Sequence, residues 1–113
     1  MLKQIIQRIG AGRLGWLLLL YGCSPAPFIK EPKTHTVEIK EMKFQPATLL
    51  LQKNDTVVFV NHDLVAHNAT EASKKAWGSP TLASGDSWKV VVTQSAGYYC
   101  TIHPVMKGKL VVQ

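Results

Sequence analysis

Cysteine is scarce in this chain: its 113 residues include only two, Cys23 and Cys100. A disulfide between them would tie the N-terminal segment to the C-terminal end of the chain, and we do not expect it. Without that bond Cys100 is a lone thiol, and a lone thiol in an oxidising compartment needs a chemical reason. The chain is also too short for two domains, so we expect one.

Acidic residues are absent ahead of Cys23, and long apolar runs are absent too. Three basic residues there precede a single apolar run at residues 14–21. This run is far shorter than the roughly 20 residues with which a helix spans a bilayer. A positive start followed by a short apolar run is typical of a secretory signal. We therefore assign residues 1–22 to an export signal and expect an exported protein.

The apolar run ends at Gly22-Cys23, which resembles the lipobox of bacterial lipoproteins. The resemblance implies cleavage before Cys23 and attachment of a lipid to that residue. Tyr21 departs from the family, where a small or β-branched residue is usual at this place. An ordinary cleaved signal or an uncleaved anchor, with Cys23 incidental, is the alternative. The protein is accordingly expected in the periplasm, either free or held at a membrane by its lipid.

Residues 23–33 contain three prolines and no periodicity, so they predict a flexible tether. The folded domain is expected at residues 34–113. The whole chain has 13 basic and seven acidic residues, a net charge of +6, whereas residues 23–113 keep ten basic and seven acidic residues, a net charge of +3. This mildly basic balance, without a basic stripe interleaved with aromatics, argues against nucleic acid as a partner.

Short alternating or β-branched segments fill the predicted domain. Residues 36–40 alternate polar and apolar, as in a half-buried strand, and residues 56–60 are apolar throughout, as in a strand buried on both faces. A slip in phase at residues 42–44 suggests a bulge or bend, and residues 69–76 could form a weak helical turn. Many short strands separated by turns predict an all-β Greek-key sandwich or barrel. Further strands are expected at residues 48–52, 87–92, 97–100 and 109–112.

Near the C-terminus, Cys100, His103 and Met106 place a thiolate, an imidazole and a thioether at equal intervals of three. Such intervals also suit a helix, but Pro104 and the flanking strand patterns favour a loop. A tight loop between two strands can direct all three side chains at one centre. Soft sulfur ligands together with imidazole favour copper, whereas structural zinc sites seldom use methionine. A second histidine is available at His67, after the apolar strand.

These segments resemble the cupredoxins, in particular their amicyanin- and plastocyanin-like branch. The resemblance covers roughly residues 35–113, and the short Cys-x-x-His-x-x-Met loop is similar to that of amicyanins. It implies one copper ion held by two imidazoles, one thiolate and a weak axial thioether, with an asparagine that braces the ligand loop. The residues in these roles are the ligands His67, Cys100, His103 and Met106, and Asn68 as the brace.

Ile102 departs from this family, whose members often carry proline two residues after the cysteine. Proline lacks a backbone N–H, so Ile102 has an amide that could donate a hydrogen bond to the Cys100 sulfur. Such a bond stabilises the electron-rich thiolate and favours Cu(I). We therefore expect the substitution Ile102→Pro to lower the reduction potential.

The resemblance implies one-electron transfer between redox proteins outside the cytoplasm, such as a c-type cytochrome or a dehydrogenase. We expect a monomer that presents the ring edge of His103 to solvent. A copper storage or delivery protein is the alternative, although delivery proteins tend to expose Met- and His-rich ligands that exchange easily. An enzyme is not expected, because four ligands leave the copper no open position for substrate. His35 and His62 are expected to be surface residues or polar residues satisfied by hydrogen bonds.

Overall fold

A computed structural model describes residues 30–113 of the chain. The predicted export signal, Cys23 and the first part of the predicted tether lie outside these residues. Residues 30–113 contain no α-helix, and so none that is long and apolar enough to cross a membrane. The strands are β1 (Thr34–Lys40), β2 (Lys43–Gln45), β3 (Thr48–Leu51), β4 (Thr56–Asn61), β5 (Thr70–Glu71), β6 (Ser87–Val91), β7 (Ala96–Tyr99) and β8 (Lys107–Val112).

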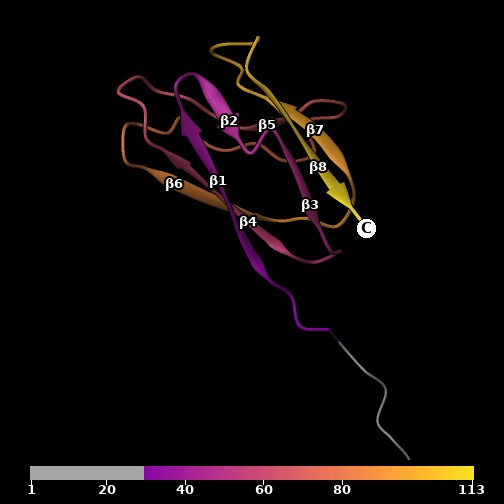
Figure 1. Ribbon diagram of the computed structural model, residues 1–113. Coiled ribbons are helices and arrows are strands. Elements are labelled where there is room, and N and C mark those ends of the chain that lie inside the picture. Colours follow the sequence, from indigo (N-terminus) through magenta and orange to yellow (C-terminus); the bar gives the residue numbers. More distant parts are fainter. Residues whose placement is uncertain (1–29) are drawn as a thin grey trace, which may run out of the picture. The chain divides into compact units, whose positions relative to one another are not determined.

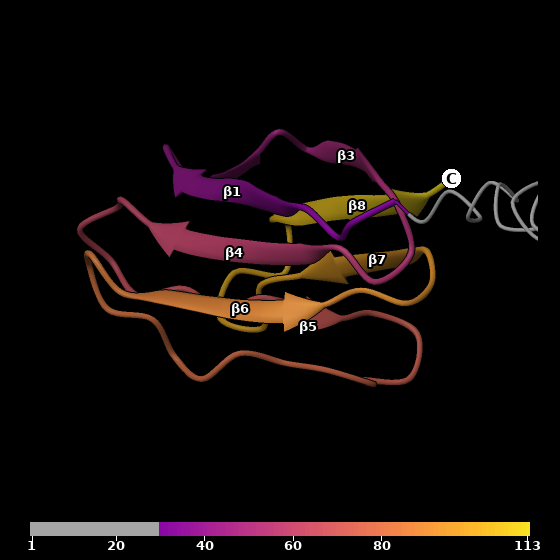
Figure 2. The same cartoon turned by 90° about the horizontal axis from the view of Figure 1, so that it is seen from below.

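The strands form two four-stranded sheets, one with the order β2-β1-β4-β6 and the other with the order β3-β8-β7-β5 (Figure 1). Figure 2 shows β1, β4 and β6 side by side in one layer, with β8 and β7 in the layer behind them. β1 runs parallel to β4 and β3 runs parallel to β8, while the other neighbours are antiparallel. The expected all-β sandwich is confirmed.

Alternating side chains fill the space between the sheets. In β4, Val57 and Phe59 are fully buried, whereas Val58 and Val60 are only partly buried. The prediction that this strand is buried on both faces was wrong, because its second face is the outer face of the β2-β1-β4-β6 sheet. Burying a valine or phenylalanine contributes about 1.5–3 kcal/mol, so the alternation decides which face of β4 turns inward.

Of the bulge or bend predicted after β1, the structure has the bend, in the form of a hairpin turn. Glu41 and Met42 both have positive φ, 57° and 61°, and they connect β1 to β2 with Lys40 opposite Lys43. Two consecutive residues in this region form the tight turn that matches the twist of antiparallel strands. Neither residue is glycine, so the turn depends on contacts from elsewhere in the molecule, which the next section describes.

Of the weak helical turn expected at residues 69–76, the structure has only a short hydrogen-bonded turn at residues 72–74. The segment begins as β5, which pairs with β7. The loop that follows folds around the buried carboxylate of Glu71, which accepts hydrogen bonds from the amides of Lys74 (2.7 Å) and Ala76 (3.4 Å). A carboxylate that satisfies several loop amides replaces the hydrogen bonds that a helical turn would have made.

Tyr98 of β7 lies in an aromatic cluster between the sheets. Its ring centroid is 4.7 Å from that of Phe44 and 5.2 Å from that of Phe59, both in edge-on geometry. Opposite Tyr98 on β8 is Gly108, where a Cβ would lie 2.2 Å from Tyr98 Cζ. Burial raises the pKa of the Tyr98 phenol, so the ring stays neutral. This packing holds the strand that leads, two residues later, to Cys100.

Candidate metal centre

Three metal-ligating side chains come together at one end of the sandwich. The ligand atoms of His67, Cys100 and His103 all lie within 4.8 Å of one another. His67 belongs to the loop after β4, whereas Cys100 and His103 belong to the loop between β7 and β8. Residues 33 positions apart in the chain therefore meet because the loop with His67 leads into β5, which pairs with β7 just ahead of Cys100.

The loop between β7 and β8, residues 100–106, is held in a tight turn by its own backbone. The amide of Cys100 donates to the carbonyl of Met106 (3.1 Å), and the amide of Met106 donates to the carbonyl of His103 (2.9 Å). The loop thus forms a closed turn and not the helix that spacing by three would also have allowed. Met106 is the last residue of this turn and is buried, with 3% of the residue exposed.

The donor atoms fit one metal ion. Cys100 Sγ lies 3.9 Å from Nδ1 of His67 and 3.9 Å from Nδ1 of His103. A metal–sulfur bond of about 2.3 Å and a metal–nitrogen bond of about 2.0 Å together exceed this distance, so one ion can bond to the sulfur and to either imidazole. A thiolate, two imidazoles and a thioether suit copper, which accepts both soft sulfur and imidazole ligands.

His67 is the most constrained of the donors. It is fully buried, and its backbone forms a bridge with Leu82 through hydrogen bonds of 3.1 Å and 2.7 Å. Its ring Nε2 donates to Oδ2 of Asp63 at 2.8 Å. Because Nε2 is engaged with the carboxylate, Nδ1 is the nitrogen left for a metal, and the ring cannot rotate without losing that bond.

Asp63 connects the metal centre to the β1–β2 turn. Besides His67, its carboxylate accepts the amides of Glu41 (2.8 Å) and Met42 (3.0 Å), the two residues with positive φ. Burial acts to raise the pKa of Asp63, but the hydrogen bonds from Met42, His67 and Glu41 outweigh it and lower the pKa below its ordinary value. The spacing of candidate ligands in the sequence did not single out Asp63. Its position four residues before His67 is the feature of the sequence that could have indicated a contact with this ligand.

Asn68 lies between the two loops. Its amide donates to Cys100 Sγ at 3.4 Å, and its side chain donates to Thr101 Oγ1 (2.6 Å) and accepts the Thr101 amide (2.9 Å). Within residues 30–113 the hydrogen bonds include none from the Ile102 amide to this sulfur, and the donor role of Ile102 stays a prediction. The Ile102 side chain is 47% exposed.

The donors differ in their access to solvent. His67, Cys100 and Met106 are buried, whereas His103 is partly exposed. The two ligand loops also carry apolar side chains that point outward: Leu64 is 95% exposed and Val105 is 89% exposed. Three of the four candidate ligands are therefore shielded from solvent, and His103 is the one that would give a bound metal a partly exposed ligand.

The other candidate residues lie apart from this centre. His35 Nε2 donates to Oδ2 of the buried Asp55 at 2.8 Å, near the start of β1. His62 is exposed, with Nε2 3.8 Å from Glu38 Oε1. Met42 is 43% exposed in the β1–β2 turn. Neither histidine belongs to the cluster of ligand atoms found among the described residues.

Comparison with known protein families gives one match along most of the chain. The model of the cupredoxin-like domain matches residues 12–112. Amicyanin from Paracoccus denitrificans is 30% identical over 83 residues, which are 68% of this chain and 63% of the relative. The chain thus spans less than two thirds of the length of that relative.

Solved structures of copper proteins superpose on the chain. The Cu(I) form of an amicyanin variant matches with a TM-score of 0.66 and 27% identity, over 80% of this chain and 95% of that chain. A copper-containing nitrite reductase from Thermus scotoductus SA-01 matches with a TM-score of 0.66 and 27% identity, over 80% of this chain but 24% of that chain. The likeness to the reductase is therefore limited to about a quarter of its length.

Proposed function

Because the chain belongs to the cupredoxin family, with a candidate site for one copper ion at His67, Cys100, His103 and Met106, we propose that it transfers single electrons between redox proteins outside the cytoplasm. When bound, the copper ion would supply the chemistry by alternating between Cu(II) and Cu(I). The contribution of the protein is to hold the four donors in one arrangement that suits both states.

The observation that carries this proposal is the set of hydrogen bonds that hold the candidate ligands in place. Asp63 and the Leu82 bridge fix His67, and Asn68 donates to Cys100 Sγ while joining the two loops. Donors held in this way change little in position when an electron arrives or leaves, and a small rearrangement favours fast electron transfer. Outer hydrogen bonds of this kind commonly set ligand orientation.

A copper storage or delivery protein is the second candidate. Such a protein needs ligands that release the ion readily, and solvent access helps this exchange. Here three of the four donors are buried, and only His103 is partly exposed. The burial favours an ion that stays in place and exchanges electrons.

The exposed edge of His103 is the proposed port for the electron. The two ligand loops also carry Leu64, Val105 and Ile102, which are 95%, 89% and 47% exposed. Exposed apolar side chains of this kind mark docking sites on soluble proteins. We propose that partners such as a c-type cytochrome or a dehydrogenase dock at this end, with the protein acting as a carrier and not as an enzyme.

The exported location is a separate part of the proposal. It rests on the basic start, the apolar run at residues 14–21 and the Gly22-Cys23 pair, which lie outside the described residues. Full-length protein should fractionate with membranes, and Cys23→Ser should move it to the soluble periplasmic fraction. Retention of the variant on membranes would point to an uncleaved anchor in place of a lipid.

The first test of the function is the visible absorption and electron paramagnetic resonance of the chain loaded with Cu(II). An intense blue band with a small copper hyperfine splitting is expected, because both report a copper–thiolate bond at Cys100. Cys100→Ser, which replaces the sulfur by oxygen at the same position, should abolish the blue band. Copper binding with weak colour and ordinary splitting would favour storage or delivery. A failure to bind copper would remove both candidates.

A further inference from the structure

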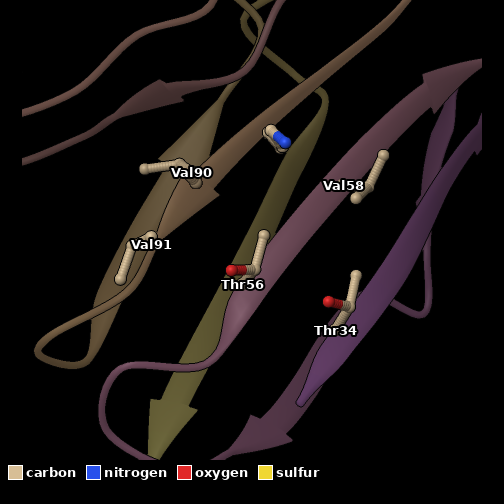
Figure 3. Close-up of a pocket in the computed structure, with 6 residues that line it drawn as sticks. Thr34, Thr56, Val58, Val90 and Val91 are labelled. Carbon is tan, nitrogen blue, oxygen red and sulfur yellow. The ribbon is translucent and has the colours of Figure 1, made fainter. Parts of the chain in front are cut away.

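Asn61, the last residue of β4, has a polar side chain at a core position. Along this strand Val57 and Phe59 turn inward and are buried, and Asn61 continues the same face with 0% exposure. The opposite face of β4 is different: Figure 3 shows Val58 at a hollow of about 460 Å³ on the outer side of the sheet. Burying an amide is costly unless its donors and its acceptor are hydrogen-bonded, so Asn61 requires partners inside the molecule.

The side chain of Asn61 uses all of its hydrogen-bonding groups. Its Nδ2 donates to the carbonyl oxygens of Val65 and Leu82, both at 2.9 Å, and its Oδ1 accepts the amide of Asp63 at 2.9 Å. An asparagine side chain has two N–H donors and one acceptor oxygen, which matches this set of partners. The reverse orientation of the amide would bring its oxygen against two carbonyl oxygens, so the partners fix its orientation.

Two of these partners also hold His67. The Leu82 carbonyl accepts the His67 amide at 3.1 Å in addition to Asn61, and the Leu82 amide donates back to the His67 carbonyl at 2.7 Å. Oδ2 of Asp63 accepts a hydrogen bond from the ring Nε2 of His67 at 2.8 Å. The third partner, Val65, lies two residues before His67 in the same loop. One side chain therefore contacts the residue that fixes the His67 backbone, the residue that fixes its ring and the loop between them.

The backbone of Asn61 is itself anchored in the sheet. It pairs with Ile39 of β1, its amide donates to the carbonyl of Asp86 at 2.9 Å, and its carbonyl accepts the amide of Gly85 at 2.7 Å. A ligand supported from a strand is held more precisely than one supported only by loop residues. Asn61 is therefore a fixed point from which the loop that carries His67 is positioned.

We propose that Asn61 is a positioning residue for copper, which holds His67 at the separation of 3.9 Å between its Nδ1 and Cys100 Sγ. Its role differs from that of Asn68, which donates to the sulfur itself. Imidazole binding matters most for Cu(II), because the thiolate and the thioether are soft ligands that select Cu(I). A loosened His67 therefore weakens the binding of Cu(II) more than that of Cu(I) and raises the reduction potential. This inference deepens the proposed electron transfer and rests on it.

Asn61→Ser in the full chain tests the proposal, because serine is too short to reach both carbonyls. In the metal-free protein, hydrogen exchange at the His67 and Leu82 amides should become roughly tenfold faster relative to the amides of β1, since it reports local opening. Cu(II) affinity, measured by competition with a chelator, should fall roughly tenfold. The potential should rise by about 59 mV for each tenfold by which Cu(II) is weakened more than Cu(I). Asn61→Gln, which displaces the amide by one methylene group, should change exchange and potential in the same direction and replaces a serine variant that does not fold.

Val58→Ala is the matched control, since it shortens a side chain of the same strand on the face of the hollow in Figure 3. It should lower stability without changing the relative exchange at His67 or the potential. Unchanged exchange in Asn61→Ser, equal losses of Cu(II) and Cu(I) affinity, or equal effects of Val58→Ala would overturn the proposal and leave Asn61 a purely structural residue. Without a blue band in the unsubstituted Cu(II) protein the electron-transfer function fails, whereas the exchange measurement still decides whether Asn61 holds His67.

Discussion

Asp63 shows how one side chain can serve the fold and the metal centre together. Its carboxylate satisfies the amides of Glu41 and Met42 in a turn that contains no glycine, and it also holds Nε2 of His67. The cost of positive φ in two residues is thereby offset by two hydrogen bonds to a charged acceptor. The geometry of the β1–β2 turn and the orientation of a copper ligand consequently depend on the same carboxylate.

Asp63→Asn tests this double role. The amide keeps the size of the side chain but loses the charged acceptor, so His67 is held less firmly. We expect copper affinity to fall about 10–100-fold, the usual effect of removing an outer hydrogen bond to a ligand. Competition with a chelator of known affinity measures it.

Asp86→Asn is the matched control, because Asp86 also accepts a loop amide, that of Ala83 at 3.0 Å, outside the metal cluster. It should leave copper affinity unchanged. If Asp63→Asn had no larger effect than Asp86→Asn, the hydrogen bond to His67 would not orient the ligand.

Ile102→Pro addresses the hydrogen bonding of the Cys100 sulfur. The amide of Asn68 already reaches Sγ at 3.4 Å, and an additional donor from Ile102 would stabilise Cu(I) further. We expect the variant to have a lower reduction potential, measured by redox titration of the blue band. Ile102→Ala retains the amide while removing the side chain and should keep the original potential. An unchanged or raised potential in the proline variant would leave Asn68 as the relevant amide.

At the level of the strands, the contact between β7 and β8 depends on Gly108. A Cβ at this position would lie 2.2 Å from Tyr98 Cζ and 2.3 Å from the hydroxyl oxygen, far inside any permitted contact. The Tyr98 ring packs against Phe44, Phe59 and Trp77, which hold it in this position. The strand pair that carries the ligand loop therefore requires a residue without a side chain.

Gly108→Ala should destabilise the protein by about 1–3 kcal/mol, the usual effect of overpacking a core. Denaturant titration of the metal-free protein measures the free energy of unfolding. Gly97→Ala is the matched control on the partner strand, where the new Cβ meets only a methyl group at 4.0 Å, and it should have little effect. Equal losses in both variants would mean that strand propensity, and not the Tyr98 contact, determines the result.

The strands differ in how far the sequence predicts them. The alternation of polar and apolar residues predicted the inward face of β1 correctly, since Val37 and Ile39 are buried and Glu38 is exposed. It failed for β4, because a run of valines does not distinguish a core face from a partly covered outer face. The spacing of Cys100, His103 and Met106 is local and could be read directly. The contact of Asp63 with the β1–β2 turn joins residues more than 20 positions apart, and local pattern contains no information on it.

For the whole molecule, two buried carboxylates set the response to acid. Hydrogen bonds from the Lys33 amide, the His35 ring and the Gln52 amide hold the pKa of Asp55 at about 2. Hydrogen bonds led by that from the Ser73 hydroxyl hold the pKa of Glu71 at about 2 as well. Both values lie below the ordinary 3.8 and 4.5, so each group favours the folded state only while it is ionised.

The contribution of these two carboxylates to the free energy of unfolding is complete above about pH 5. It is lost as the pH falls through 4 toward 2. We expect the free energy of unfolding of the metal-free protein to decline steeply over this range. Asp55→Asn and Glu71→Gln should each flatten the decline and lower stability at pH 5. Glu38→Gln removes an exposed carboxylate and should preserve the shape of the curve. A decline of the same steepness in all three variants would contradict the assignment.

The parallel pairing of β1 with β4 places the start of the domain at the end opposite to the metal centre, which matters for attaching the protein to a surface. Thr34 pairs with Thr56 at one end, and Ile39 pairs with Asn61 at the other, where the loop that contains His67 begins. Seven residues of β1 at about 3.3 Å each extend roughly 20 Å. A protein immobilised on an electrode through a linker ahead of Thr34 would therefore present His103 away from the electrode, toward soluble partners. Direct electron exchange with the electrode would instead need an attachment beside Val105.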